Sequence, residues 1–183
     1  GWGMANFYYG NGRTGQYNPG TAILRLEENG RFHLFIGSPD IGQGSDTAMG
    51  QIAAEALGVP ADLVDVTSAD TALTFDSGTT SGTRLTYVVG NGVLDAGRKL
   101  RRMLLEVGAG FLGVAAGGVE IGPEGLRAKG KAIQWRELEA RARGLGVPLQ
   151  VVGRFDPPTT DVDARTGDGV PYGCFTFGTQ WAR

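Results

Sequence analysis

Residues 39–60 read PDIGQGSDTAMGQIAAEALGVP and join a glycine-rich turn directly to a helical pattern. Apolar residues recur after the turn at the spacing of one buried helix face. They are Met49, Ile52, Ala53, Ala56 and Leu57. We expect Ser45 or Asp46 to cap this helix. Gly58 is expected to end it, and Pro60 blocks its continuation. The stretch therefore predicts a turn-helix unit whose glycines let something approach the backbone.

A β-hairpin is predicted immediately before this unit. Residues 21–26 and 31–37 alternate between apolar and other residues, and Asn29-Gly30 lies in the turn between them. An Asn-Gly turn between alternating segments is typical of hairpins. A short strand over 63–67 is expected after the helix.

A long helix is expected from Leu85 to Val107, with Gly92 on its buried stripe, where glycine indicates close packing. The charged run 98–102 is interpreted as a solvated face, with phosphate binding as the alternative. Further along, the pattern predicts a helix at 135–143 ended by Gly144, and three strand segments. These are 119–121 within the glycine-rich region 111–132, then 147–155 and 174–178. Residues 1–20 indicate an irregular or short-strand segment.

This order of elements predicts an α+β fold, a two-layer domain of mixed β-strands packed with helices. The 183 residues are long enough for one domain, with sub-halves 1–110 and 111–183 as the alternative division. The net charge of -2 gives no basic stripe, so no nucleic-acid partner is expected. No apolar run reaches membrane-spanning length, and we expect a cytoplasmic protein.

Single copies of cysteine and histidine exclude several kinds of site. Cys174 is the only cysteine, so neither an internal disulfide nor a cysteine-based zinc cluster can form. His33 is the only histidine and falls in the alternating segment 31–37. It is interpreted as a partly buried strand residue, and histidine-dependent hydrolysis is not expected.

Two loops could carry chemistry. Gly42-Gln43-Gly44 offers backbone N–H groups, the positive end of a helix dipole and an amide that donates and accepts. This combination suits a phosphate or the edge of a heterocycle, but turn glycines before a helix are commonly steric, and this is the alternative. No Lys-Ser/Thr pair follows as in a P-loop, and the spacing differs from the dinucleotide-binding pattern.

The second loop is 76–84, DSGTTSGTR, within a polar stretch that starts at Ser68. Small and hydroxyl-bearing residues ahead of a helix can form a second cradle of N–H groups and hydroxyls. The alternative is a helix-capping loop rich in turn formers. Because each loop leads into a helix, the two loops could face one ligand from two sides.

Taken together, these segments resemble the large, molybdopterin-binding subunit of the xanthine dehydrogenase/aldehyde oxidase family, from its C-terminal half. The resemblance covers essentially the whole chain. It rests on GSPDIGQG (37–44), Thr47, QIAAE (51–55), LGVP (57–60), Asp70-Thr71, Gly82-Thr83-Arg84, Thr86 and YGCFTFGTQ (172–180).

The resemblance implies that both loops hold the molybdopterin cofactor, whose tail carries a phosphate or a nucleotide. The residues implied are Gly42, Gln43 and Gly44 in the first loop, and Thr80, Ser81, Gly82 and Thr83 in the second. The family usually has serine at the position of Thr83, which keeps the hydroxyl, and glycine at that of Ser81. No protein ligand to molybdenum is implied.

The resemblance further implies hydroxylation of an aldehyde or N-heterocycle with oxygen from water. The general base is a glutamate in a glycine-glutamate motif that lies beyond this sequence in the family, so no catalytic residue is assigned here. Glu120 and Glu124 lie beside glycines and are interpreted as turn residues, and Glu55 as structural. The implied partners are the rest of the subunit, iron–sulfur partners and, in some members, a flavin (FAD) partner. The alternative is a non-enzymatic domain that binds a phosphate-bearing ligand or a protein.

Overall fold

The predicted hairpin forms the centre of the main sheet. In the computed structural model, which describes residues 1–12 and 19–183, β2 (Gly20–Leu26) pairs antiparallel with β3 (Phe32–Ile36). β4 (Val64–Ser68) then pairs parallel with β3, and β8 (Gln150–Phe155) pairs antiparallel with β2. The strand order is β4-β3-β2-β8. The hairpin prediction is confirmed, and β8 begins three residues later than the predicted 147.

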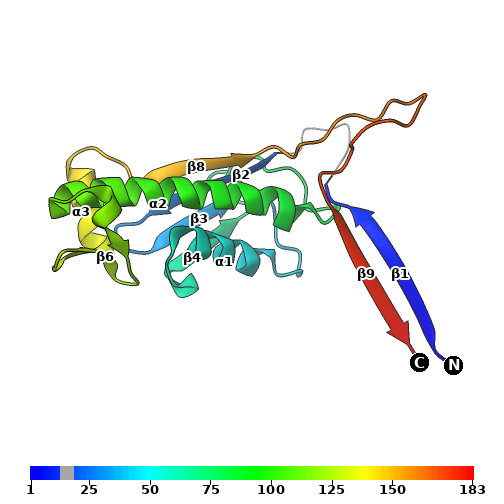
Figure 1. The fold of residues 1–183 in the computed structure, drawn as a ribbon, viewed down its shortest axis with the longest axis horizontal. Helices are drawn as coiled ribbons and strands as arrows, with labels where there is room; N and C mark the ends of the chain where they lie inside the picture. Colours follow the sequence, from blue (N-terminus) through cyan, green and yellow to red (C-terminus); the bar gives the residue numbers. More distant parts are fainter. Residues whose placement is uncertain (13–18) are drawn as a thin grey trace.

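Helices α1 (Ser45–Leu57) and α2 (Gly90–Leu112) lie side by side against this sheet, which gives the expected two-layer α+β architecture (Figure 1). Completely buried apolar side chains fill the space between the layers. Gly92 permits the close approach that was predicted, because a Cβ there would lie 2.6 Å from the carbonyl oxygen of Gly20 in β2.

The ends of α1 are built by glycines. Gly44 and Gly58 both adopt left-handed backbone conformations, with φ of 81° and 82°. The predicted cap from the side chain of Ser45 or Asp46 is wrong, because the N-cap residue is Gly44, which has no side chain. Asp40 replaces it, because its Oδ2 accepts the backbone N–H of Asp46 at 3.1 Å.

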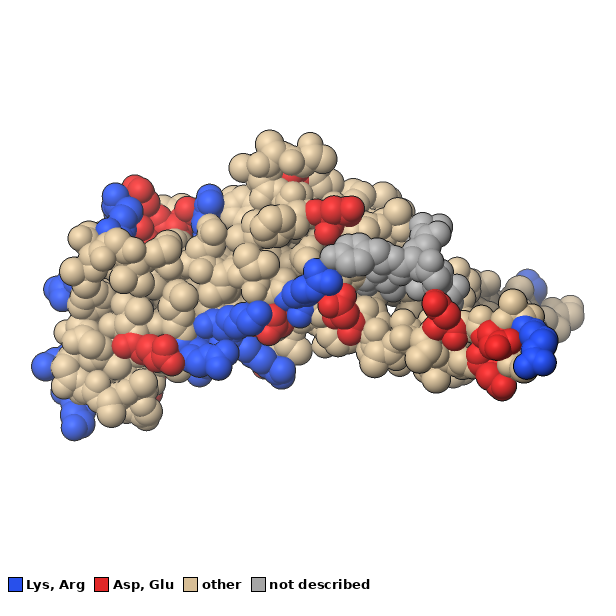
Figure 2. Space-filling model, turned by 90° about the horizontal axis from the view of Figure 1, so that it is seen from above, with Lys and Arg blue, Asp and Glu red and all other residues tan. Residues whose placement is uncertain are grey.

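Helix α2, taken together with the turn before it, is longer than the predicted 85–107. A π-helical turn at Leu85–Val89 leads into it, and it ends at Leu112, followed by Gly113 with φ of 67°. Its basic run is only partly a solvated face, because Arg101 donates to the carbonyl oxygen of Leu57 at the end of α1. On the face shown in Figure 2, acidic and basic side chains lie among one another.

A smaller sheet and α3 (Trp135–Gly144) pack at the far end of α2. The sheet consists of β5 (Glu120–Ile121), β6 (Gly125–Ala128) and β7 (Lys131–Gln134), all antiparallel. The ring of Trp135 meets that of Phe32 edge to face at 5.1 Å, which joins this part to the main sheet. The helix predicted at 135–143 is confirmed.

Strands β1 (Gly3–Gly10) and β9 (Phe175–Ala182) form a separate antiparallel ribbon that projects from the body (Figure 1). Gly3 pairs with Ala182, so both chain ends lie at the ribbon tip. An eight-residue strand replaces the irregular or short segment expected near the N-terminus, and the last strand extends four residues past the predicted Gly178.

His33 is a half-buried strand residue, as predicted. Its Nε2 lies 2.8 Å from the hydroxyl of Thr67, and its Nδ1 lies 3.3 Å from the carboxylate of Glu27. Across the described residues, no group of three or more His, Cys, Asp or Glu side chains could hold a metal ion. None of the described helices is long and apolar enough to cross a membrane.

Candidate functional site

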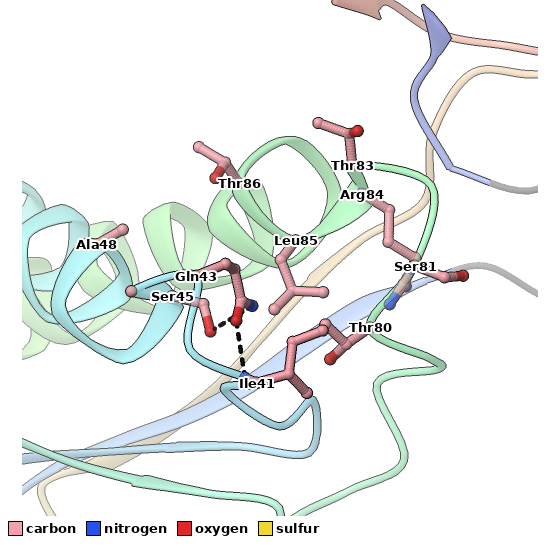
Figure 3. A pocket seen from close by; sticks show the side chains of 11 residues that line it. Ile41, Gln43, Ser45, Ala48, Thr80, Ser81, Thr83, Arg84, Leu85 and Thr86 are labelled. Carbon is pink, nitrogen blue, oxygen red and sulfur yellow. Dashed lines mark hydrogen bonds between the residues drawn. The ribbon is translucent and has the colours of Figure 1, made fainter.

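The two loops singled out in the sequence meet at one cavity of about 260 Å³ (Figure 3). The first loop and the start of α1 form one wall, and the second loop and the π-helical turn form the other. Figure 3 shows the side chain of Leu85 between these walls. The lining residues are Ile41, Gln43, Gly44, Ser45, Ala48, Thr80, Ser81, Thr83, Arg84, Leu85 and Thr86.

The first loop is fixed by its own polar side chains. Gln43 accepts the N–H of Ile41 at 2.7 Å and donates to the hydroxyl of Ser45 at 3.0 Å. Asp40 accepts the N–H of Gly42 at 2.7 Å, in addition to that of Asp46. These two backbone N–H groups, with smaller contributions from Gly44 and Ser45, hold the pKa of Asp40 below its ordinary value. Asp40 therefore brings a negative charge to the N-terminus of α1.

The second loop is anchored to the ends of β2 and β3. The buried hydroxyl of Ser77 donates to the carbonyl oxygen of Thr21 at 2.9 Å and accepts the N–H of Gly37 at 3.2 Å. Thr80 then donates to the carbonyl oxygen of Pro39 at 2.7 Å, which ties the second loop to the segment before the first. The two walls of the cavity are thus positioned by the same pair of strands.

The buried side chain of Arg84 holds the second loop in place through hydrogen bonds. This side chain is 1% exposed, and its guanidinium donates to the carbonyl oxygens of Thr79 and Pro19 at 3.0 and 3.1 Å. Gly78 leaves room for it, because a Cβ at Gly78 would lie 3.2 Å from the guanidinium carbon. A buried cation beside the cavity favours an anionic ligand there.

The backbone of the first loop is open to an approaching ligand. Gly42 and Gly44 have φ of 99° and 81°, and a Cβ at either position would meet no atom within 4 Å. Gly82, with φ of 60°, is different, because its Cβ would lie 2.6 Å from the carbonyl oxygen of Gly12. Thr83 is left-handed despite its branched side chain, with φ of 54°. Such backbone conformations are uncommon for threonine and cluster at functional sites.

Five of the seven predicted site residues line the cavity: Gln43, Gly44, Thr80, Ser81 and Thr83. Gly42 and Gly82 are absent from the lining, and they shape the two loops instead. The other six lining residues were not predicted as site residues: Ile41, Ser45, Ala48, Arg84, Leu85 and Thr86. The weak signal for Arg84 was its position as the last residue of the second loop, where its side chain could have faced either solvent or a ligand.

A groove between α1 and α2 adjoins this cavity and shares Ala48 and Thr86 with it. The groove measures about 650 Å³ and is lined by both helices. The cavity alone lies near the lower end of the usual range for ligand pockets, about 300–1,000 Å³. A ligand larger than the cavity could extend along the groove.

The features of the cavity fit an elongated, anionic, hydrogen-bonding group such as molybdopterin. The open glycine backbone, the N-terminus of α1 and the buried Arg84 all favour negative charge. Ser81, Thr83 and Thr86 add exposed hydroxyl-bearing side chains at the rim. The carboxylate of Asp40 would repel an anionic group placed at Gly42. The negatively charged part of such a ligand therefore fits better beside Gly44 and the second loop.

A family model described as "Molybdopterin cofactor-binding domain" matches residues 1–183.

Curated relatives are considerably longer than this chain. The carbon monoxide dehydrogenase large chain of Afipia carboxidovorans is 29% identical over 168 residues, which cover 80% of this chain and 20% of the relative. The "Probable hypoxanthine oxidase XdhD" of Escherichia coli is 38% identical over 108 residues, or 57% of this chain and 11% of the relative. The chain thus spans about a fifth or less of these relatives.

Solved structures share the fold over almost the entire chain. Carbon monoxide dehydrogenase from Oligotropha carboxidovorans matches with a TM-score of 0.73 and 25% identity, covering 99% of this chain and 23% of that one. Aldehyde oxidoreductase from Desulfovibrio gigas matches with a TM-score of 0.75 and 24% identity, covering 99% of this chain and 18% of that one.

Proposed function

Because this chain belongs to the molybdopterin cofactor-binding domain family of the xanthine dehydrogenase, aldehyde oxidoreductase and carbon monoxide dehydrogenase large subunits, we propose that it supplies part of the cofactor cradle of a molybdenum hydroxylase. The complete enzyme would oxidise an aldehyde or an N-heterocycle with oxygen from water, in the cytoplasm. Its partners would be the rest of the subunit, iron–sulfur centres and, in some arrangements, a flavin.

One observation carries this proposal. The first loop and the second loop are about forty residues apart in sequence, yet they form opposite walls of one cavity at the N-terminus of a 13-residue helix. A steric turn and a capping loop would each explain one loop alone. Neither explains why the second loop is bonded both to β2 and to Pro39, just ahead of the first loop, whose glycine backbone stays open.

Each proposed residue has a distinct role in the cradle. The Gln43 amide has two donors and two acceptor positions, of which Ile41 and Ser45 use one each. The remaining donor and acceptor can therefore bind the edge of a pterin. Gly44 admits the ligand to the backbone, and Gly42 shapes the first loop beside it. Ser81 and Thr83 contribute hydroxyls.

The second loop owes its shape to residues that need not touch the ligand. Thr80 holds the two loops together through Pro39, and Gly82 permits the left-handed turn against Gly12. Molybdopterin, when bound, supplies the metal centre at which hydroxyl transfer and two-electron oxidation take place. The residues of this chain bind and orient that group.

No residue of this chain is proposed as the general base. Glu120 and Glu124 are exposed and lie on the small sheet and its turn, remote from the residues that line the cavity. We propose that the base lies in the remainder of the subunit. This chain alone would then hold part of the cofactor without turning over substrate.

The test is molybdenum and pterin content per mole of the complete subunit, compared between wild type and the variants Gln43→Ala and Ser81→Ala. We expect near-stoichiometric loading in wild type and a severalfold loss in both variants. Gln134→Ala is the matched control, because Gln134 is exposed on β7, away from the cavity. Its loading should equal that of wild type.

Two other outcomes would count against the proposal. A well-folded complete subunit without molybdenum or pterin would favour the non-enzymatic binding domain. If both cavity variants were fully loaded with molybdenum and pterin, the cofactor-binding site would have to lie elsewhere than at these loops.

A further inference from the structure

The β1–β9 ribbon has one strongly apolar face. Directly paired residues of antiparallel strands project from the same side of the sheet. Met4 pairs with Trp181, Tyr8 pairs with Phe177, and Phe175 contacts the ring of Tyr8 at 6.1 Å. These five residues, which we call the ribbon face, are between 47% and 75% exposed.

The opposite side of the ribbon is different in character. By the same pairing it carries the small and polar residues Ala5, Thr176 and Gln180, and also Tyr9, which is 53% exposed. Phe7 also lies on this side, but its ring covers Gly178, where a Cβ would lie 2.3 Å from ring atoms. The ribbon face is therefore the more apolar of the two sides, with five large exposed side chains against two on the opposite side.

The side of the ribbon that carries the ribbon face has a single pair of polar residues, and these two side chains are hydrogen-bonded to each other. This pair, Asn6 with Thr179, forms its hydrogen bond of 2.8 Å between the two apolar pairs. Five exposed large side chains make an apolar surface on the order of several hundred Å², a size that usually marks an interaction site. A two-stranded ribbon is also marginally stable by itself in water.

We propose that the ribbon face packs against another domain of the same polypeptide, which would extend or cover this two-stranded sheet. This inference rests on the proposed function. It is supported by the length of the relatives, because at least three quarters of each matched solved chain lies outside this fold. Those matches cover 99% of this chain, so the ribbon itself is included in the shared fold.

A second copy of this chain is the competing occupant. Pairing of two ribbon faces would bury the same residues, but it would leave most of a longer subunit without a role at this surface. Charge complementarity does not distinguish the two occupants, because none of the five residues of the ribbon face is charged. The two arrangements differ in whether contacts are within one polypeptide or between two.

Site-specific photo-crosslinking in the polypeptide from the complete gene distinguishes these arrangements. Benzoylphenylalanine would replace Tyr8 on the ribbon face, or Phe7 on the opposite side as the matched control. We expect Tyr8 crosslinks to peptides outside residues 1–183, at unchanged polypeptide mass and at severalfold higher yield than from Phe7. Crosslinks at twice the mass, crosslinks confined to residues 1–183, equal yields, or no crosslink would each overturn the proposal.

A second variant checks the same surface without a bulky probe. Tyr8→Ser with Phe177→Ser should lower the melting temperature of the complete subunit by several degrees, and Phe7→Ser should lower it less. An equal or smaller effect of the double variant would contradict the inference. Molybdenum and pterin content, measured on the crosslinked protein, separates the two proposals. Intramolecular crosslinks in a cofactor-free protein would refute only the proposed function. A cofactor-loaded protein that forms no such crosslinks would refute only the docking surface.

Discussion

At the scale of single residues, the candidate site depends on side chains that hold loops more than on side chains that face the cavity. Asp40, Ser77 and Arg84 each bond backbone groups of a loop, and two of the three are completely buried or nearly so. Sequence reasoning found the loops because glycines and hydroxyl residues gather there. It could not identify the side chains that hold these loops in place. Asp40, for example, bonds the N–H of Asp46 six residues later, and no local sequence pattern indicates such a contact.

Arg84→Lys should destabilise the fold and reduce cofactor loading. Lysine cannot reproduce the forked contacts to Thr79 and Pro19. The loss of buried, charged hydrogen bonds should cost roughly 2–4 kcal/mol in the free energy of unfolding. Urea unfolding measures this change. Arg102→Lys, at an exposed position on α2, is the control, and a comparable loss in that variant would contradict a special role for Arg84.

Asp40→Asn should weaken the first loop in a pH-dependent way. Because backbone N–H groups lower the pKa of Asp40 in the fold, its carboxylate stabilises the fold at pH values above its ordinary pKa of 3.8. That stabilisation disappears as the pH falls through the lower folded value. The asparagine variant, which cannot accept both N–H groups equally, should be less stable at pH 7 and should lose less stability on acidification.

Unfolding free energies at neutral pH and between about pH 4 and pH 2 test this prediction. Asp161→Asn changes the same formal charge on an exposed loop and provides the comparison. Identical acid profiles for Asp40→Asn and wild type would show that the Asp40 carboxylate does not stabilise the loop.

At the scale of elements, glycines set how closely α2 can approach its neighbours. Gly92 faces the backbone of β2, and Gly97 faces Ala56 of α1, where a Cβ would lie 2.3 Å from that side chain. The helical and hairpin periodicities were sufficient to predict β2, β3, α1, α2 and α3. They predicted the start of β9 but neither the full extent of β1 and β9 nor their pairing, because the paired residues are more than 160 positions apart.

Gly92→Ala and Gly110→Ala should have opposite effects although both lie in α2. A Cβ at Gly92 would press on the carbonyl of Gly20, and such overpacking costs about 1–3 kcal/mol. A Cβ at Gly110 would meet no atom within 4 Å. Alanine there should stabilise the helix by about 0.5–1 kcal/mol. Thermal or urea unfolding of both variants measures this difference, and destabilisation by both would contradict the packing argument.

At the scale of the whole molecule, the body and the ribbon should differ in stability. The body has a continuous buried core, whereas the ribbon has two strands with mostly exposed side chains. Local stability follows burial of apolar contacts. The body could be predicted as α+β from periodicity alone. The ribbon could not be predicted in this way, because the local sequences FYYG and FTFG do not indicate that each strand pairs with the other end of the chain.

Hydrogen exchange of this 183-residue chain should therefore be uneven. We expect amide protons of β1 and β9 to exchange orders of magnitude faster than those of β2 and β3, because a two-stranded ribbon opens at little cost. Mass spectrometry of peptic peptides measures the rates. Equal protection of ribbon and body would indicate that the ribbon is stabilised by contacts beyond those described.

The pairing of β2 with β8 has a consequence for biosynthesis. Gly20 lies opposite Phe155, so β2 lacks one neighbour until about 130 further residues have been translated. Ribosomes add about 5–20 residues each second, so an incomplete sheet edge would persist for many seconds during translation. During that interval the nascent protein presents β2 as a free edge, and we expect chaperones to engage this stretch before the last strands emerge.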